Sequence, residues 1–387
     1  MTSPHSKNRI AVCATKLLAK SMVSAILCVG SAVCAPAQDA QPDKPDTWTA
    51  TTQTSAGYTN PLRTTESHAK SGNRSVDKQR VEVLGPNGRY QPDRETEKET
   101  IQVSATTTRT VERTYGWDVN GHRYLVQETE EEARSSTSGD AQVVRTTSNS
   151  DANGNLHVVQ REVSDTRKTS PSAQETKTTV YLADGNGGWT PSYRTQELKK
   201  GSVDHRVEVK KTMLVPDSNG NWKMGEVKES TITEDGKNRT SEERISRADL
   251  EGRLSEVSRS VGTETENAAG EKSNTVETYS VDVPGSAIDG SLHLSQRITT
   301  VQKKDSGGKT TEQQVEQPNP SDPKVSLQVN TKTKYIVQYA SSGTQQTKTT
   351  QVRDINGNFK VVSVETQKSD QTPAAQAQTA PSDKPKY

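Results

Sequence analysis

The chain is poor in the residues that build enclosed sites: of its 387 residues, three are Cys, one is Phe and four are Trp. Cys13, Cys28 and Cys34 all lie within the first 37 residues, which have the features of a secretory signal peptide. Removal of this segment leaves no thiol, which excludes disulfides and thiolate metal sites from the mature chain. So few aromatic rings also leave little with which to line an apolar pocket.

The signal peptide is predicted from three consecutive features. Basic residues come first, at Lys7, Arg9, Lys16 and Lys20, followed by an apolar run over 21–33 and then Ala35-Pro36-Ala37. This order predicts cleavage after Ala37 and export to a bacterial envelope or to the exterior. One alternative is an uncleaved membrane anchor, for which the apolar run is short. The other is a lipoprotein signal at Cys34, but the preceding residues 31–33 match the usual Leu-small-small sequence poorly.

Hydrophobic residues make up only 28% of the chain. Several ordinary globular cores are therefore excluded, and the chain must be either partly disordered or folded into a thin structure. Its 50 Lys and Arg balance 49 Asp and Glu, and removal of the signal segment leaves 46 basic against 49 acidic residues. This even mixture gives no electrostatic footprint for nucleic acid.

Catalytic motifs are also missing. There is no Gly-x-Ser-x-Gly elbow, no His-Glu-x-x-His and no phosphate-binding Gly loop. The six histidines are scattered, at His5, His68, His122, His157, His205 and His293. Acidic pairs such as Glu130 and Glu132 are interpreted as solvated strand charges rather than as a glycosidase dyad, which needs a shaped cleft. We expect no catalytic residues, no metal, no cofactor and no enzymatic activity.

What the chain does have is a tandem repeat of about 33 residues, marked by glycines in turn-forming sequences. The marker glycines are Gly88, Gly121, Gly154, Gly187, Gly220, Gly252, Gly290 and Gly357. The turn missing between the last two is supplied by 318–323. A second turn falls within most repeats, so each repeat consists of two segments and two turns.

The segments are rich in Thr and Val, which favour strands. Asn-Gly between them predicts β-hairpins with type I′ turns and strands of about 10–13 residues. The predicted fold is all-β: a long antiparallel meander, open and twisted or coiled into a superhelix, over residues 79–368. A signal peptide at 1–37, a polar flexible linker at 38–78 and a disordered tail at 369–387 complete the chain. A propeller is the alternative, whereas Glu128–Arg134 lacks the alternating apolar face of a membrane barrel.

Candidate binding residues follow the marker glycines by two positions, or by three after Gly121. The aromatic ones are Tyr90, Tyr124, Trp189, Trp222 and Phe359. These side chains are predicted to form a stripe, either packed within the sheet or exposed as a platform on which sugar rings stack. The Asp in turns such as Asp151–Asn155 is interpreted as turn chemistry rather than as a calcium ligand.

Over six residues, Asp151–Leu156, the turn is similar to the tyrosine-aspartate repeats of bacterial Rhs-type shell proteins. The spacing is too long for that family and the preceding Tyr is missing, so membership is not inferred. Export, repetition and polarity predict a secreted or envelope structural or adhesive protein. The alternative is a carbohydrate-binding protein that uses Trp189 and Trp222. The partner is unknown, with cell-surface polysaccharide or an envelope protein as candidates, and no membrane span is expected after cleavage.

Overall fold

The structure is a computed structural model that describes residues 47–56, 61–202, 205–281, 283, 290–319, 327–340 and 343–369. The predicted signal peptide at 1–37 lies outside these residues, as do 38–46 of the linker and 370–387 of the tail. Among the described residues there is no helix long and apolar enough to cross a bilayer.

The described chain is built from β-strands, as the Thr and Val content predicts. The strands are β1 Thr47–Ala56, β2 Leu62–Ser71, β3 Arg74–Leu84, β4 Tyr90–Ser104, β5 Thr107–Trp117, β6 Arg123–Ser135, β7 Ala141–Ser150, β8 Leu156–Ser170, β9 Ala173–Ala183, β10 Trp189–Gly201, β11 Arg206–Pro216, β12 Trp222–Asp235, β13 Asn238–Ala248, β14 Leu254–Glu266, β15 Lys272–Ser280, β16 His293–Asp305, β17 Gly308–Gln317, β18 Gln328–Ala340, β19 Gly343–Arg353 and β20 Phe359–Ser369.

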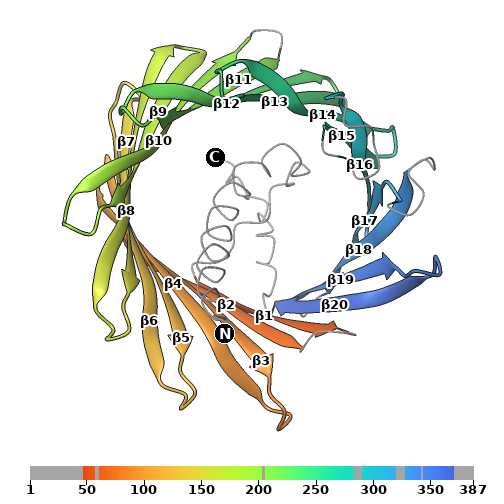
Figure 1. The fold of residues 1–387 in the computed structure, drawn as a ribbon. Helices are drawn as coiled ribbons and strands as arrows, with labels where there is room; N and C mark the ends of the chain where they lie inside the picture. Colours follow the sequence, from red (N-terminus) through yellow and green to blue (C-terminus); the bar gives the residue numbers. More distant parts are fainter. Residues whose placement is uncertain are drawn as a thin grey trace, which may run out of the picture. The chain divides into compact units, whose positions relative to one another are not determined.

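These strands form one closed barrel (Figure 1). Each strand pairs antiparallel with the next, and β1 also pairs antiparallel with β20, with Thr52 opposite Gln367. The single sheet contains 20 strands. All-β structure is therefore confirmed, but the predicted open or superhelical meander is wrong. Closure removes the two strand edges that an open sheet would expose to other chains.

Both sides of Glu128–Arg134 are polar, as the sequence predicts, yet this segment belongs to a strand of the closed barrel. The error lay in equating every barrel with a membrane-spanning one. Backbone hydrogen bonding and strand twist can close a sheet whatever its side chains face.

Two strands, β1 and β2, lie within 38–78, where a flexible linker was expected. They complete the circle between β20 and β3. Their Thr-rich sequences have no marker glycine, and for this reason the repeat pattern does not reveal them. At the other end, β20 extends to Ser369, one residue beyond the expected repeat region.

The repeat turns are not of the predicted type I′. In the turn Asp151–Asn155, Gly154 has φ 82°, and His205 is the sole non-Gly residue with positive φ in the described part of the chain. Asn153 therefore keeps a negative φ. The Oδ1 atom of Asp151 accepts hydrogen bonds from the N–H groups of Asn153 and Asn155 at 2.8 and 2.9 Å. This is a type I turn followed by a left-handed Gly.

Each of the nine hairpins from β3–β4 to β19–β20 has a register shift just after its marker turn. Such bulges bend strands and increase their twist, which favours a curved wall. We call the end of the barrel that carries these turns the Asn-Gly rim. At the opposite rim the turns include Ser136–Asp140, Ser170–Ser172 and Asp235–Lys237.

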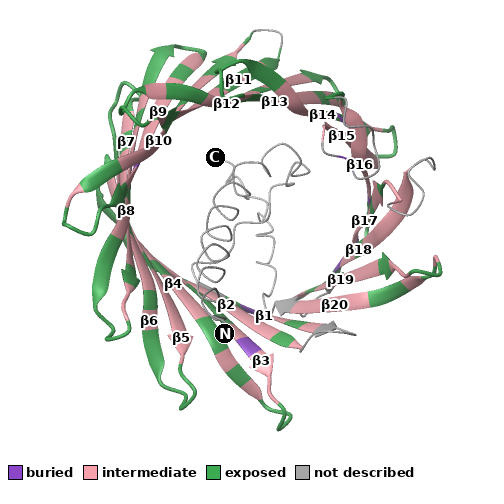
Figure 2. Cartoon of the chain, in the orientation of Figure 1, coloured by how far each residue is buried: buried purple, intermediate pink, exposed green. Residues whose placement is uncertain are grey.

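The barrel wall has almost no buried core (Figure 2). Of the described hydrophobic residues, the buried ones are Ala50, Val180, Val227, Val283 and Val337. Most strand residues are half-buried against neighbours on adjacent strands. This thin construction is the one that the low hydrophobic content predicts, with stability coming from strand ladders and cross-strand side-chain pairs.

Candidate functional site

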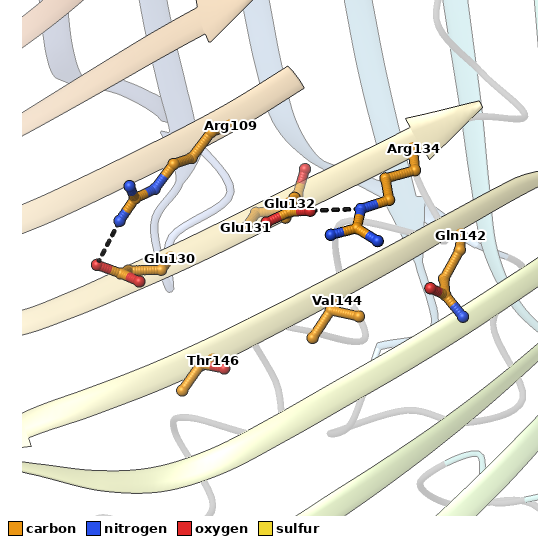
Figure 3. Close-up of a pocket in the computed structure, with 8 residues that line it drawn as sticks. All are labelled: Arg109, Glu130, Glu131, Glu132, Arg134, Gln142, Val144 and Thr146. Carbon is orange, nitrogen blue, oxygen red and sulfur yellow. Dashed lines mark hydrogen bonds and ion pairs between the residues drawn. The ribbon is translucent and has the colours of Figure 1, made fainter. Parts of the chain in front are cut away.

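The ladder register divides the strand residues between two faces of the wall. Figure 3 views β5, β6 and β7 from the side on which Arg109, Glu130 and Arg134 project, with the far wall of the barrel behind them. This side is the outer face. Directly paired residues share a face and successive residues alternate, so the outer or inner position of the other strand residues follows from their pairings.

The inner face is polar and rich in threonine. Its threonines include Thr96, Thr110, Thr114, Thr129, Thr147, Thr178, Thr195, Thr300, Thr333 and Thr350. Neighbouring hydroxyls bond to one another, as between Ser164 and Thr178 at 2.6 Å. Several inner charges are paired across strands, as in Arg145 with Glu131 at 2.5 Å and Lys228 with Glu243 at 2.8 Å. The wall therefore presents hydroxyls and neutralised ion pairs to the interior.

The interior is wide. Twenty strands spaced about 4.8 Å apart and tilted about 40° give a barrel roughly 40 Å across at the backbone. Inner side chains of Thr and Glu extend only about 3–6 Å from the wall, so they cannot meet across such a space. Barrels of roughly 16–18 strands already leave an aqueous channel. The described strands thus surround a lumen that their own side chains do not fill.

The middle of the outer face is covered by ion pairs. Arg113 contacts Glu128 at 2.6 Å, and Arg297 contacts Glu277 at 2.9 Å and Glu316 at 3.2 Å. The pKa of the arginine in each set is raised, mainly by the hydrogen bond that its guanidinium donates to Glu128 or Glu277. Charges at these positions indicate a surface in contact with water.

A shallow cleft of about 360 Å³ lies on this outer face over β5, β6 and β7 (Figure 3). Within it Glu130 contacts Arg109 at 3.2 Å, and Glu132 contacts Arg134 at 2.5 Å. Each glutamate is thus neutralised by an arginine, which supports their interpretation as solvated strand charges rather than as an acid and base pair.

Apolar side chains gather on the outer face at the Asn-Gly rim, in two rows that we call the outer collar. The row nearest the rim contains Tyr90, Trp117, Leu156, Trp189, Trp222, Leu254 and Phe359, and the second row contains Leu125, Val158, Pro191, Met224, Leu294, Val329 and Val361. Two rows of a tilted strand span about 10 Å. The outer collar is therefore much shorter than the roughly 25 Å apolar band of a membrane-spanning barrel.

Cations lie over several rings of the outer collar. The guanidinium of Arg63 is 4.6 Å from the centre of the Tyr90 ring, and that of Arg194 is 4.2 Å from the Trp222 ring. The ammonium of Lys332 lies 4.2 Å from the centre of the Phe359 ring. In all three cases the strand that carries the cation lies two strands before the strand that carries the ring, as β2 does before β4. Cation–π contact thus occupies one face of each ring.

Four of the five candidate binding residues, Tyr90, Trp189, Trp222 and Phe359, lie in the outer collar. The fifth, Tyr124, pairs with Gly116 on the inner face, while its neighbour Leu125 occupies the outer position. In that repeat Arg123 takes the place in the outer collar that a ring has in other repeats, and it pairs with Trp117 on β5. Ligand stacking on these rings stays a prediction.

Sequence reasoning missed the second row of the outer collar. A bulge follows it in each hairpin, so a simple alternation counted from mid-strand assigns these residues to the wrong face. The missed signal was the spacing from the marker glycine: Val158, Pro191, Met224 and Val361 each follow it by four residues.

The turn carboxylates at this rim are occupied within the turns themselves. The N–H of Asn155, the His157 side chain at 3.1 Å and the N–H of Asn153 lower the pKa of Asp151 to about 2. The pKa values of Asp118, Asp217, Asp249 and Asp354 are lowered in the same way, mainly by the backbone N–H four residues on. These contacts account for the repeated Asp by turn chemistry.

No family model and no curated protein matches this chain. Among solved structures it is similar to the siderophore receptor PirA from Pseudomonas aeruginosa, with a TM-score of 0.42, 9% identity and coverage of 84% of this chain and 80% of that one. It is also similar to the outer membrane protein OpdK from P. aeruginosa, with a TM-score of 0.39, 8% identity and coverage of 84% of this chain and 97% of that one. A BenF-like porin from P. fluorescens Pf-5 gives a TM-score of 0.36, 10% identity and coverage of 84% of this chain and 98% of that one. At these scores the likeness carries no functional argument.

The expected function, a secreted structural or adhesive repeat protein with carbohydrate binding as the alternative, is corrected by the closure of the sheet. Its premise was an extended open sheet, and pairing of β1 with β20 closes that sheet into a tube. The fold and its faces define a closed antiparallel β-barrel with a polar lumen.

Proposed function

We propose that the chain forms a water-filled conduit for hydrophilic solutes in the bacterial cell envelope. The observation that carries this proposal is the pairing of β1 with β20, because a closed sheet of 20 strands encloses a lumen. The Thr-rich inner face supports it, since hydroxyls and paired charges are readily hydrated. Passage would be selected by size more than by charge, because the inner charges named above neutralise each other.

The outer face supports a conduit whose wall stands mainly in water. Arg113, Glu128 and their neighbours occupy the middle of that face, and charges there oppose contact with hydrocarbon. The conduit would therefore be attached to a membrane or to other envelope components rather than crossing lipid along its full length.

Size-graded thiol labelling tests the proposal. Thr129→Cys places a thiol on the inner face and Glu130→Cys places one on the outer face of the same strand. We expect both to react with a small maleimide, and only the outer thiol to react at full rate with polymer-linked maleimides wider than about 30 Å, given the roughly 40 Å backbone diameter. Equal reaction of both thiols with every reagent would contradict a tube, and no reaction of the inner thiol would contradict a hydrated lumen.

Passage can be measured in cells that export the Thr129→Cys chain. Modification by the largest reagent that still enters should slow uptake of a hydrophilic fluorescent solute relative to cells treated in the same way that export the Glu130→Cys chain. Unchanged uptake despite full modification would argue against solute passage.

A further inference from the structure

The Asn-Gly rim carries apolar residues at the tips of its turns, beyond the outer collar. Val119, Leu250 and Ile355 each follow the turn Asp directly and are 102%, 106% and 102% exposed. They come from three separate hairpins around the barrel, β5–β6, β13–β14 and β19–β20. Exposed large apolar residues that share one rim with an apolar collar indicate an interaction surface.

The opposite rim differs in composition. Its turns include Ser136–Asp140, Ser170–Ser172 and Asp235–Lys237, which contain no large apolar residue. Near that rim, the described large apolar side chains that are exposed include Val103 and Tyr339, at 61% and 54%. The apolar surface is thus concentrated at one end of the tube.

A belt of cations follows the outer collar on the side away from the rim. Arg161, Arg194 and Lys332 lie on the outer face of β8, β10 and β18, each three residues after the second-row position. The same position is held on β14 and β16 by Arg259 and Arg297, which are paired with glutamates, and on β4 and β6 by Glu95 and Glu128. Arg194 and Lys332 reach back over collar rings. From the end of the tube inwards, the order is therefore apolar tips, apolar and aromatic collar, and cations.

We propose that the Asn-Gly rim docks into the surface of an anionic lipid leaflet, with the tube standing upright on it. Interfacial protein segments bury apolar side chains about 5–10 Å into the headgroup and acyl boundary, and the outer collar has about this height. Trp and Tyr favour this boundary, and the cation belt then lies at the level of lipid phosphates, where Lys and Arg extend their charged ends. The collar is too short to cross the bilayer, so docking is confined to one leaflet.

This inference is independent of solute passage, since a tube could dock without conducting and could conduct without docking. It is tested with the exported chain purified from producing cells and with vesicles of phosphatidylcholine, alone or with phosphatidylglycerol. Binding is measured by vesicle flotation, and circular dichroism checks that each variant is folded.

The tip variant is Val119→Ser with Leu250→Ser and Ile355→Ser, and the matched control is Val103→Ser near the opposite rim. Because the three tips are fully exposed, folding should be unaffected, while binding to phosphatidylglycerol vesicles should weaken about tenfold or more. The control should bind as the parent does. A charge variant, Arg194→Gln with Lys332→Gln, should weaken binding about fivefold per cation on anionic vesicles and little on phosphatidylcholine.

Depth is read from Trp fluorescence quenching by brominated lipids, in which Trp189 and Trp222 should be quenched by bromines near the headgroups. Three results would overturn the proposal: no binding to anionic vesicles, equal loss of binding in the tip and control variants, or binding that the tip variant leaves unchanged. Flotation that needs a second protein would instead assign the rim to a protein partner.

Discussion

A planar lipid bilayer should not be spanned by this barrel, and the structure sets the size of the barrier. On the outer face of β5 and β6 lie four arginines and three glutamates: Arg109, Arg113, Arg123, Arg134, Glu128, Glu130 and Glu132. Each Arg facing lipid near the midplane costs about 2–4 kcal/mol. This one hairpin therefore opposes insertion by several kcal/mol, and the inner face of the same strands, with Glu112 and Glu131, offers no apolar alternative.

The assay is single-channel recording after adding the exported chain to one side of the bilayer, with a porin as the positive control. We expect no stable conductance steps from the chain, and solubility without detergent once it has folded. Stable steps, or folding that requires detergent micelles, would refute the reasoning that the outer wall stands in water.

Three further predictions concern the wall and its turns. Gly154→Ala should destabilise the barrel by about 1–2 kcal/mol in urea unfolding, because the backbone φ of 82° at this position is left-handed. The control Gly225→Ala should be nearly neutral, since its new methyl group would meet its nearest neighbour at 3.6 Å. Equal effects of the two substitutions would contradict the turn assignment. A double-mutant cycle on Arg113→Gln and Glu128→Gln should give a coupling of about 0.2–1 kcal/mol that shrinks in high salt, and a salt-independent coupling would mean that the pair does not face water. The pKa of Asp151 is lowered to about 2 in the folded chain. Its turn contacts therefore stabilise the fold fully above the unfolded pKa of about 3.9, and this contribution is lost as the pH falls through about 2. An Asp151→Asn variant should lack this part of the acid response, and an acid unfolding transition identical to that of the parent would contradict the prediction.

Local structure could be predicted from the sequence because its signals are local. The marker glycines and Thr-rich segments predicted hairpins, and β3 to β20 follow them. The low hydrophobic content likewise predicted a thin wall with few buried residues. Type I′ turns were predicted wrongly because Asn-Gly suits several turns, and the Asp at the first position selects type I by accepting two backbone N–H bonds.

Closure could not be predicted, because it depends on strands that the repeat does not mark. β1 and β2 lack the marker turn, and the register of β1 with β20 joins residues about three hundred positions apart. Four of the five aromatic candidates share the outer face and Tyr124 lies on the inner face, while ligand binding by any of them stays a prediction. The outer face on which the four lie depends on the bulge after each turn, and a bulge leaves no residue signature comparable to Asn-Gly.

The distance between β1 and β20 tests the central claim most directly. Spin labels at Gln53→Cys and Thr366→Cys, which are paired residues across the seam, can be measured by pulsed electron paramagnetic resonance in the folded chain. A closed barrel predicts a separation below about 20 Å, allowing for the label linkers, since paired strands are about 5 Å apart. A flat open sheet of the same strands would place the labels about 90 Å apart, and a distance near that value would contradict the barrel and the conduit built on it.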